Sequence, residues 1–310
     1  MSTVFLGTTE FAVAVLECLA HARAHRPALV ITRPDRPAGR GRRLSSPPVA
    51  RAARELDLPL AQPERVNSPE VVEQIADANP NAVIVCAFGA LITEPLLGAY
   101  EILNVHPSLL PRWRGAAPVE RAIMAGDARI GVSIMRLTAG LDAGPVCATA
   151  VEEIRPDDTY GTLAARLRER GGELLVDALD RRAREGELEF TEQDDAQATY
   201  AEKISAADRV LDPREPAAHV ERVVRALHPH IGARAALSDG TMLGVHRAAL
   251  ASENGQQAGT DAGAGVLACD GHLLLACSPG ELELLRVTPP GGREMDGAAY
   301  LRGHGLPPRR

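Results

Sequence analysis

Uninterrupted apolar runs alternate with segments of helical periodicity along the first part of the chain. The runs are 3–7 (TVFLG), 28–33 (ALVITR), 81–89 (NAVIVCAFG) and 100–106 (YEILNVH). After the first run, Phe11, Val15 and Leu19 recur every four residues, which is the spacing of one helix face. Strands without polar alternation are typical of a parallel sheet that is covered on both faces. The pattern therefore predicts an α/β open sheet in which strands and helices alternate.

This pattern continues to about residue 182 and then stops. The next expected elements are helices over 49–56 and 69–78 and strands over 131–137 (GVSIMRL) and 144–154 (GPVCATAVEEI). Residues 159–182 predict a long helix, weakened at Gly171–Gly172 because glycine disfavours helix interiors. The following residues, Glu185–Ser205, are mostly polar and predict a linker.

A second domain is expected after Asp208, where the pattern of polar and apolar residues changes. A helical segment over 216–227 precedes short segments in which polar and apolar residues alternate. Asp-Gly pairs, typical of tight hairpin turns, occur in 238–241 (SDGT) and 269–272 (CDGH), whereas 253–265 is a low-complexity loop. These features predict a small β-rich, barrel-like domain. The expected division is a first domain over 1–189, a linker over 190–207 and a second domain over 208–310.

Composition excludes several classes of protein. Hydrophobic residues make up 45% and charged residues 24% of the chain, the balance of a globular protein with a sizeable core rather than of a disordered one. No run approaches the roughly 18 apolar residues of a membrane helix, and the N-terminus lacks the features of a signal peptide. The 5 cysteines are scattered along the chain and include no Cys-x-x-Cys pair. We therefore expect no zinc site, no disulfide framework and a reducing, cytoplasmic location.

Asn104 and His106 interrupt the polarity pattern at the end of an apolar run. At positions i and i+2 they share one face of a strand, and ligands of open α/β sheets bind at the carboxyl ends of the strands. An asparagine amide can donate to a developing oxyanion, and a histidine, with its reference pKa of about 6.5, can exchange a proton near neutral pH. The alternative is that both side chains satisfy backbone groups of the loop.

Two further segments carry candidate chemistry. Asp142 lies in a tight glycine-containing loop (TAGLDAG) and could orient an imidazole, although an aspartate at a turn is often structural. The stretch Arg33–Arg43 carries five arginines against one aspartate, and its glycines and prolines argue against regular structure. Such a stretch suits phosphate binding, or else is a solvated loop. Arg112, Trp113 and Arg114 add charge and a stacking surface, while the net charge of −7 argues against a nucleic-acid binder when taken alone.

Longer segments show a resemblance to a known family. Residues 104–127 (NVHPSLLPRWRGAAPVERAIMAGD) and 131–146 (GVSIMRLTAGLDAGPV) resemble the folate-dependent formyltransferases, and Asn104, His106 and Asp142 match the catalytic trio of that family. Three other segments are similar to the members that act on methionyl initiator tRNA: FLGTTEFAVAVLECL, TRPDRPAGRGRRL and TYAEKIS. The resemblance covers the first domain nearly throughout, reaches the linker and is thinner in the last ~100 residues, and the arginine-rich segment selects the tRNA enzymes.

The resemblance implies a fold, a reaction and a set of site residues. The fold would be a Rossmann-like formyltransferase domain with a mostly parallel sheet, followed by a smaller C-terminal OB-like β-barrel. A formyl group would pass from 10-formyltetrahydrofolate, a co-substrate, to the α-amino group of methionyl initiator tRNA, for translation initiation. The protein would be a monomer without a metal. The folate-binding residues implied are Ser108, Leu109, Leu110 and Pro111, and the tRNA-binding residues are Arg36, Arg40, Arg42 and Arg43.

Other functions are open at this point. A nucleotide-sugar amine formyltransferase would share the trio and a small C-terminal domain, but it needs no arginine-rich loop. A purine-pathway formyltransferase fits less well, because such enzymes are usually one shorter domain. A non-catalytic tRNA-binding module is the alternative from a different class, which the intact trio disfavours. Pro107 follows the histidine where the tRNA enzymes often have glycine, and HPHIGARAAL lacks the tryptophan expected in the second domain.

Overall fold

Seven strands form the main sheet of the computed structural model, which describes residues 1–38, 43–251 and 265–304. Their order is β10-β9-β7-β6-β1-β2-β5, and the five from β7 to β5 are parallel, while β9 and β10 run antiparallel to their neighbours. Their bounds are β1 Thr3–Gly7, β2 Pro27–Ile31, β5 Leu60–Ala61, β6 Ala82–Cys86, β7 Ile102–His106, β9 Arg129–Arg136 and β10 Val146–Glu153. These pairings confirm the prediction of a mostly parallel sheet, and β1, β6 and β7 are buried at every position, as expected for central strands.

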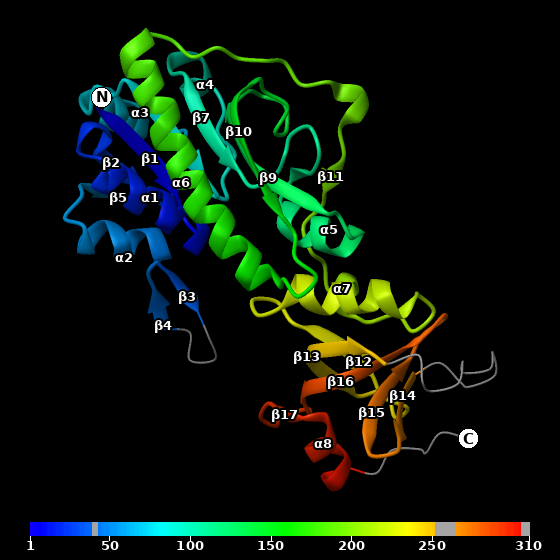
Figure 1. The fold of residues 1–310 in the computed structure, drawn as a ribbon. Helices are drawn as coiled ribbons and strands as arrows, with labels where there is room; N and C mark the ends of the chain where they lie inside the picture. The colour runs from blue at the N-terminus through cyan, green and yellow to red at the C-terminus, as the bar shows by residue number, and fades with distance from the viewer. Residues whose placement is uncertain (39–42, 252–264, 305–310) are drawn as a thin grey trace. The chain divides into compact units, whose positions relative to one another are not determined.

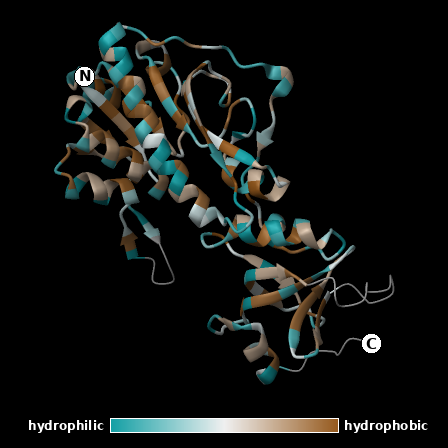
Figure 2. Cartoon of the chain, in the orientation of Figure 1, coloured by the Kyte–Doolittle hydropathy of each residue, from teal (hydrophilic) through white to brown (hydrophobic). Residues whose placement is uncertain are grey.

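Helices cover both faces of this sheet (Figure 1). On one face, Val71 and Ile75 of α3 pack in a single hydrophobic cluster with Val4 and Leu6 of β1. On the other lie α1 and α6. The helices of this part of the chain are α1 Glu10–His21, α2 Pro48–Glu55, α3 Pro69–Asp77, α4 Leu96–Ala99 and α6 Tyr160–Glu185, with the 3-10 turn η1 Arg23–His25. In Figure 2, α6 carries hydrophobic and hydrophilic residues along its length, as a helix with one face on a sheet does.

Helix α6 is continuous at the two glycines where the sequence predicted a weakened helix. The helix runs without a break through Gly171 and Gly172, and both positions lie close against other elements. A Cβ atom on Gly172 would lie 2.4 Å from Sγ of Cys18 in α1, and one on Gly171 would lie 3.1 Å from Val105 of β7. Tertiary packing therefore overrides the low helix propensity of glycine at this point.

The arginine-rich stretch is also more regular than the sequence suggested. Arg36–Ala38 (β3) pairs antiparallel with Arg43–Ser45 (β4) in a two-stranded sheet apart from the main one (Figure 1). The carboxylate of Asp35, at the base of this hairpin, accepts hydrogen bonds from Gln62 at 2.7 Å and from Ser46 at 2.8 Å. These two bonds hold the pKa of Asp35 below its ordinary value, so the base of the hairpin is tied to the rest of the chain by an ionised group.

The chain divides into two compact units. The first comprises Met1–Gly115, Arg129–Glu153 and Ala164–Ala201, and the second comprises Ala116–Ala128, Ile154–Leu163 and Glu202–Arg310. Short segments before and after β9 and β10 thus belong to the second unit, and α6 begins in one unit and continues in the other. The division at residues 189 and 207 expected from the sequence stays a prediction.

An antiparallel sheet forms the centre of the second unit, in the order β12-β13-β16-β15-β14, with β17 beside β16. Its ends, β12 and β14, also contact each other, so the sheet curls into the expected OB-like barrel. Both predicted Asp-Gly turns join neighbouring strands, β12 to β13 and β14 to β15. The elements are α5 Pro118–Ala125, η3 Ala207–Arg209, α7 Ala217–Leu227, β12 Ala233–Ala236, β13 Met242–Leu250, β14 Gly265–Cys269, β15 His272–Ala276, β16 Glu281–Thr288, β17 Met295–Asp296 and α8 Gly297–Gly303.

Within the second unit, a half-buried ion pair joins α5 to the segment that begins at Glu202. Nη1 of Arg121 donates to Oδ1 of Asp208 at 2.8 Å, and the other carboxylate oxygen accepts from the backbone N–H and the hydroxyl of Ser205. The bond from Arg121 holds the pKa of Asp208 well below its usual range.

Across the described part of the chain, no helix combines the length and the apolarity needed to cross a bilayer.

Candidate active site

Strand β7 presents Asn104 and His106 on one face at its carboxyl end. Both are largely buried, with exposed fractions of 8% and 5%. The chain turns directly after the strand, where the N–H of Ser108 donates to the carbonyl of His106 at 2.9 Å. Within the described ranges, the Asn104 side chain makes no hydrogen bond. Its amide is therefore free to donate to a ligand at the end of the sheet where ligands of open α/β folds bind.

His106 lies between a backbone carbonyl and a carboxylate. Its Nε2 is 2.9 Å from the carbonyl oxygen of Trp113, and its Nδ1 is 3.7 Å from Oδ2 of Asp142. A carbonyl oxygen can only accept, so Nε2 carries a proton and donates it to Trp113. Nδ1 is then the nitrogen that takes up a second proton, and that proton would lie beside the Asp142 carboxylate.

Asp142 is held by its side chain and by its backbone. Oδ2 accepts a hydrogen bond of 2.8 Å from the N–H of Gly115, and the backbone carbonyl accepts one of 2.8 Å from Nε2 of Gln193. Its backbone φ is 46°, in the left-handed region that few non-glycine residues occupy. The sequence resemblance predicted that His106 and Asp142 act together, and the structure brings these two side chains together.

The strand that supports this pair comes from the segment between residues 107 and 115. Arg114–Gly115 (β8) pairs in parallel with Tyr200–Ala201 (β11), and Thr199 Oγ1 accepts from the N–H of Trp113 at 2.9 Å. Gly115 has φ 120°, and a Cβ atom there would lie 2.7 Å from the carbonyl of Ala201, so only glycine fits. The stretch 185–205, which the sequence predicted as a linker, thus contains η2 Asp195–Gln197 and β11 in its second half.

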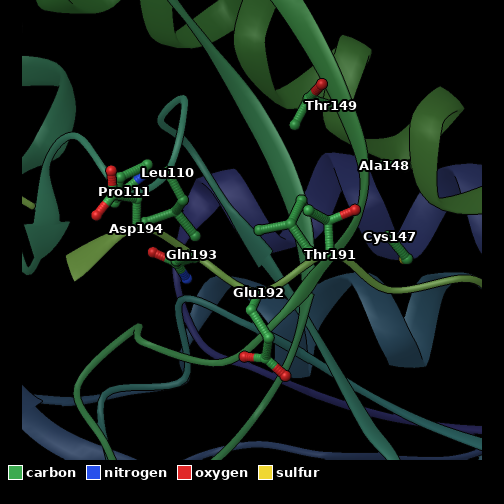
Figure 3. Close-up of a pocket in the computed structure, with 10 residues that line it drawn as sticks. Leu110, Pro111, Cys147, Ala148, Thr149, Thr191, Glu192, Gln193 and Asp194 are labelled. Atoms are coloured by element: carbon green, nitrogen blue, oxygen red, sulfur yellow. The ribbon is translucent and has the colours of Figure 1, made fainter. Parts of the chain in front are cut away.

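The four residues expected to bind folate divide into two pairs. Ser108 is fully buried, and Leu109 packs so closely on Gly131 of β9 that a Cβ atom there would lie 2.5 Å from the leucine. Leu110 and Pro111 instead line a cavity of about 370 Å³, shown in Figure 3. Its other lining residues are Val146, Cys147, Ala148, Thr149, Thr191, Glu192, Gln193 and Asp194. A cavity of this size is in the range of small-molecule sites.

None of the three predicted catalytic side chains lines this cavity. Gln193 connects the two places, because it lines the cavity and its amide holds the Asp142 backbone. Burial raises the pKa of the Cys147 thiol in the cavity wall to about 11, so the thiol is uncharged at neutral pH. Over the described ranges, no group of three or more His, Cys, Asp or Glu side chains is arranged to hold a metal ion.

Two of the four arginines expected to contact tRNA lie on the β3–β4 hairpin. Arg36 and Arg43 are exposed on its two strands, and Arg36 forms an ion pair with Glu64. Arg40 and Arg42 lie outside the described residues. Near the site, the guanidinium of Arg112 stacks over the Trp113 ring, with Cζ 4.3 Å from the ring centroid.

Several site residues were missed by the sequence analysis. Arg114 was noted only for adding charge and a stacking surface with its neighbours, yet it is 3% exposed and bonds to Gln193 and Asp195. The segment TYAEKIS was noticed only through its resemblance, and nothing local marked Thr199 as a partner of Trp113. Nothing in the sequence marked Gln193 as a site residue, because it lies in a polar stretch without hydrophobic periodicity.

Both halves of the chain match sequence profiles of formyltransferases. Residues 1–179 match the family described as "Formyl transferase", and residues 203–305 match "Formyl transferase, C-terminal domain". The structure of HypX from Aquifex aeolicus in complex with tetrahydrofolic acid has a similar fold, with a TM-score of 0.65 and 19% identity, over 99% of this chain and 48% of that one.

Full-length relatives narrow the class further. The chain is 43% identical to the methionyl-tRNA formyltransferase of Halorhodospira halophila over 98% of this chain and 97% of that protein. It is 40% identical to that of Methylococcus capsulatus over 100% of this chain and 99% of that protein. The chain belongs to the formyltransferase family and, within it, to the methionyl-tRNA formyltransferases. Its reaction is the formylation of methionyl-tRNA.

Proposed function

We propose that the chain transfers the formyl group of 10-formyltetrahydrofolate to the α-amino group of methionyl initiator tRNA, as a monomer in the cytoplasm. The observation that carries this proposal is the His106–Asp142 pair at the carboxyl end of β7, beside the amide of Asn104, which has no hydrogen-bond partner among the described residues. The three groups are an oxyanion donor, a proton carrier and a carboxylate, which are the groups that acyl transfer to an amine requires.

The reaction makes one bond and breaks one. The uncharged α-amino nitrogen attacks the formyl carbon, the bond from this carbon to folate N10 breaks, and N10 takes up the proton that the amine loses. Negative charge develops on the formyl oxygen in between. The Asn104 amide is the donor available to that oxygen, and a removed oxyanion donor typically costs a factor of about 10²–10³ in rate.

The role of His106 follows from its two partners. Because Nε2 donates to the Trp113 carbonyl, the imidazole gains a proton at Nδ1, beside Asp142. The resulting cation stabilises the oxyanion electrostatically and stores the proton that moves from the amine to N10, directly or through water. Asp142 orients the ring and balances its positive charge.

Leu110 and Pro111 are proposed to contact the folate donor, since they line the cavity next to the site, and Ser108 and Leu109 to fix their position. Arg36 and Arg43, with Arg40 and Arg42, are proposed to contact the phosphates of the tRNA. Exposed arginines on a hairpin suit this role, because the guanidinium binds phosphate in a bidentate manner.

The experiment that tests this proposal mixes the purified chain with 10-formyltetrahydrofolate and methionyl initiator tRNA and measures formyl-methionyl-tRNA. We expect formylation of the charged tRNA and none of an amino sugar linked to a nucleotide. Transfer to the amino sugar alone would favour a nucleotide-sugar formyltransferase. Binding of tRNA without any transfer would favour the non-catalytic tRNA-binding module.

A further inference from the structure

The segment from Thr191 to Ala201 is bonded to both sides of the His106–Asp142 pair. At its start, the backbone N–H and carbonyl of Thr191 bond to Val146 at 2.9 Å each, just after the Asp142 loop. At its end, the Thr199 carbonyl accepts from the N–H of Arg114 at 2.9 Å, and β11 pairs with β8. One stretch of chain therefore spans the loop that carries Asp142 and the strand that supports His106.

Gln193 lies near the start of this segment and uses its whole side-chain amide. Nε2 donates to the backbone carbonyl of Asp142 at 2.8 Å and to that of Gly144 at 2.6 Å. Oε1 accepts from Nε of Arg114 at 3.0 Å. Both amide hydrogens are donated to the Asp142 loop, and the amide oxygen accepts a hydrogen bond from strand β8.

Arg114 links Gln193 to strand β8, on the His106 side of the His106–Asp142 pair. It is 3% exposed, and its Nη2 bonds to Asp195 at 2.7 Å, so its guanidinium is fixed. Its neighbours in sequence make the contacts of the site: the carbonyl of Trp113 accepts from His106, and the N–H of Gly115 donates to Asp142. A displacement of β8 relative to the Asp142 loop would therefore change both contacts at once.

We propose that Gln193 is a positioning residue for formyl transfer, which fixes the Asp142 carboxylate against His106. The proposal rests on the catalytic roles given above to these two residues. Asp142 has the unfavourable φ of 46°, so its loop needs external bonds to hold this conformation. Without the Gln193 amide, the carbonyls of Asp142 and Gly144 lose their donor, and the loop relaxes away from the histidine.

The chain offers a matched control for this residue. Gln197 lies in the same segment, is exposed, and its amide bonds only to the nearby Asp194, at 2.7 Å. Gln197→Ala removes the same chemical group from the same stretch without touching the Asp142 loop. Gln193→Glu provides a variant of equal size, which keeps the acceptor for Arg114 but loses both donors to the loop.

The first measurement is kcat and KM for methionyl-tRNA. Gln193→Ala and Gln193→Glu are expected to lower kcat by about 10-fold or more, because misplacement of a reacting group by about 1 Å can cost 10²-fold. KM for methionyl-tRNA is expected to stay within about twofold, and Gln197→Ala is expected to match the parent chain. An unchanged kcat in both Gln193 variants overturns the proposal, and so does a rise in KM alone.

The second measurement combines Gln193→Ala with Asp142→Asn. If Gln193 acts through Asp142, the double variant is no slower than Asp142→Asn alone, whereas independent effects on kcat multiply. Multiplied losses overturn the positioning role but leave the catalytic role of Asp142 intact. Normal kcat in Asp142→Asn itself removes Asp142 from the mechanism and overturns both proposals, so the two failures can be told apart.

Discussion

Nδ1 of His106 faces Oδ2 of Asp142 at 3.7 Å, although His106 ends strand β7 and Asp142 lies in the loop between β9 and β10. The distance is longer than a hydrogen bond and short enough for a strong charge interaction. Each group is also fixed by a backbone partner, the carbonyl of Trp113 for the imidazole and the N–H of Gly115 for the carboxylate. The pair is therefore preorganised in the protein alone, without help from a substrate.

Asp142→Asn tests the charge of this pair while keeping its shape. The asparagine oxygen can still accept from Gly115, but it cannot balance a protonated imidazole. We expect kcat to fall by about 10²-fold, the lower end of the usual contribution of acid–base groups. The control is Asp77→Asn at the exposed end of α3, which should leave steady-state formylation unchanged. Equal kcat values for the two variants would mean that the Asp142 charge has no part in the reaction.

The ion pair of Arg36 with Glu64 predicts an effect of a neighbouring carboxylate on tRNA binding. Arg36→Ala and Arg43→Ala should each weaken tRNA binding and reduce the log–log salt slope by about one unit if each contacts one phosphate. Glu64→Gln should strengthen binding, because it frees Arg36 and removes a negative charge from the hairpin. Binding is measured by salt titration. Arg170→Ala, on the exposed surface of α6, is the control, and a salt slope unchanged in the hairpin variants would exclude phosphate contacts there.

The bond between Arg121 and Asp208 predicts a pH-dependent contribution to stability in the second unit. The folded pKa of Asp208 is depressed below the unfolded value of about 3.9, so the stabilisation is fully present above that value and is lost as pH falls toward the folded pKa. Asp208→Asn should lower the free energy of unfolding by about 1–2 kcal/mol at pH 7. In urea unfolding, the difference from the parent chain should shrink below about pH 4. A difference that grew in acid would contradict this assignment.

Gly172→Ala tests the close packing of α6 on α1. Alanine would gain up to about 1 kcal/mol of helix propensity, but its Cβ would clash with Cys18 at 2.4 Å. Overpacking typically costs about 1–3 kcal/mol, so we expect net destabilisation in chemical denaturation. Cys18→Ala should restore part of the loss, and Gly303→Ala at the open end of α8 should cost little. A Gly172→Ala chain more stable than the parent would show that the helix can shift freely.

The elements that the sequence predicted correctly are those whose cause is local. The continuous apolar runs became β1, β6 and β7, because a strand buried on both faces needs no polar position. The Asp-Gly pairs became the expected turns, because their backbone preference is set within two residues. The resemblance, rather than periodicity, related Asn104 and His106 to Asp142.

The features that the sequence did not predict depend on partners far along the chain. Gln193 bonds to two backbone carbonyls. Every residue has a backbone carbonyl, so the sequence does not mark which ones are its partners. Gly172 seemed a weak point because the opposing Cys18 cannot be inferred from helix propensity. The hairpin at Arg36 is held by Asp35, Gln62 and Ser46, which no local pattern relates to one another.

The rate of a single turnover in Asn104→Ala and His106→Ala tests the central claim most directly. Each variant is mixed with 10-formyltetrahydrofolate and saturating methionyl initiator tRNA, and the first turnover is followed by rapid quench, with circular dichroism and tRNA binding as checks on the fold. The account predicts a loss of about 10²–10³-fold in each variant, with unchanged affinity for tRNA. A rate near that of the parent chain in either folded variant would contradict the mechanism proposed for this site.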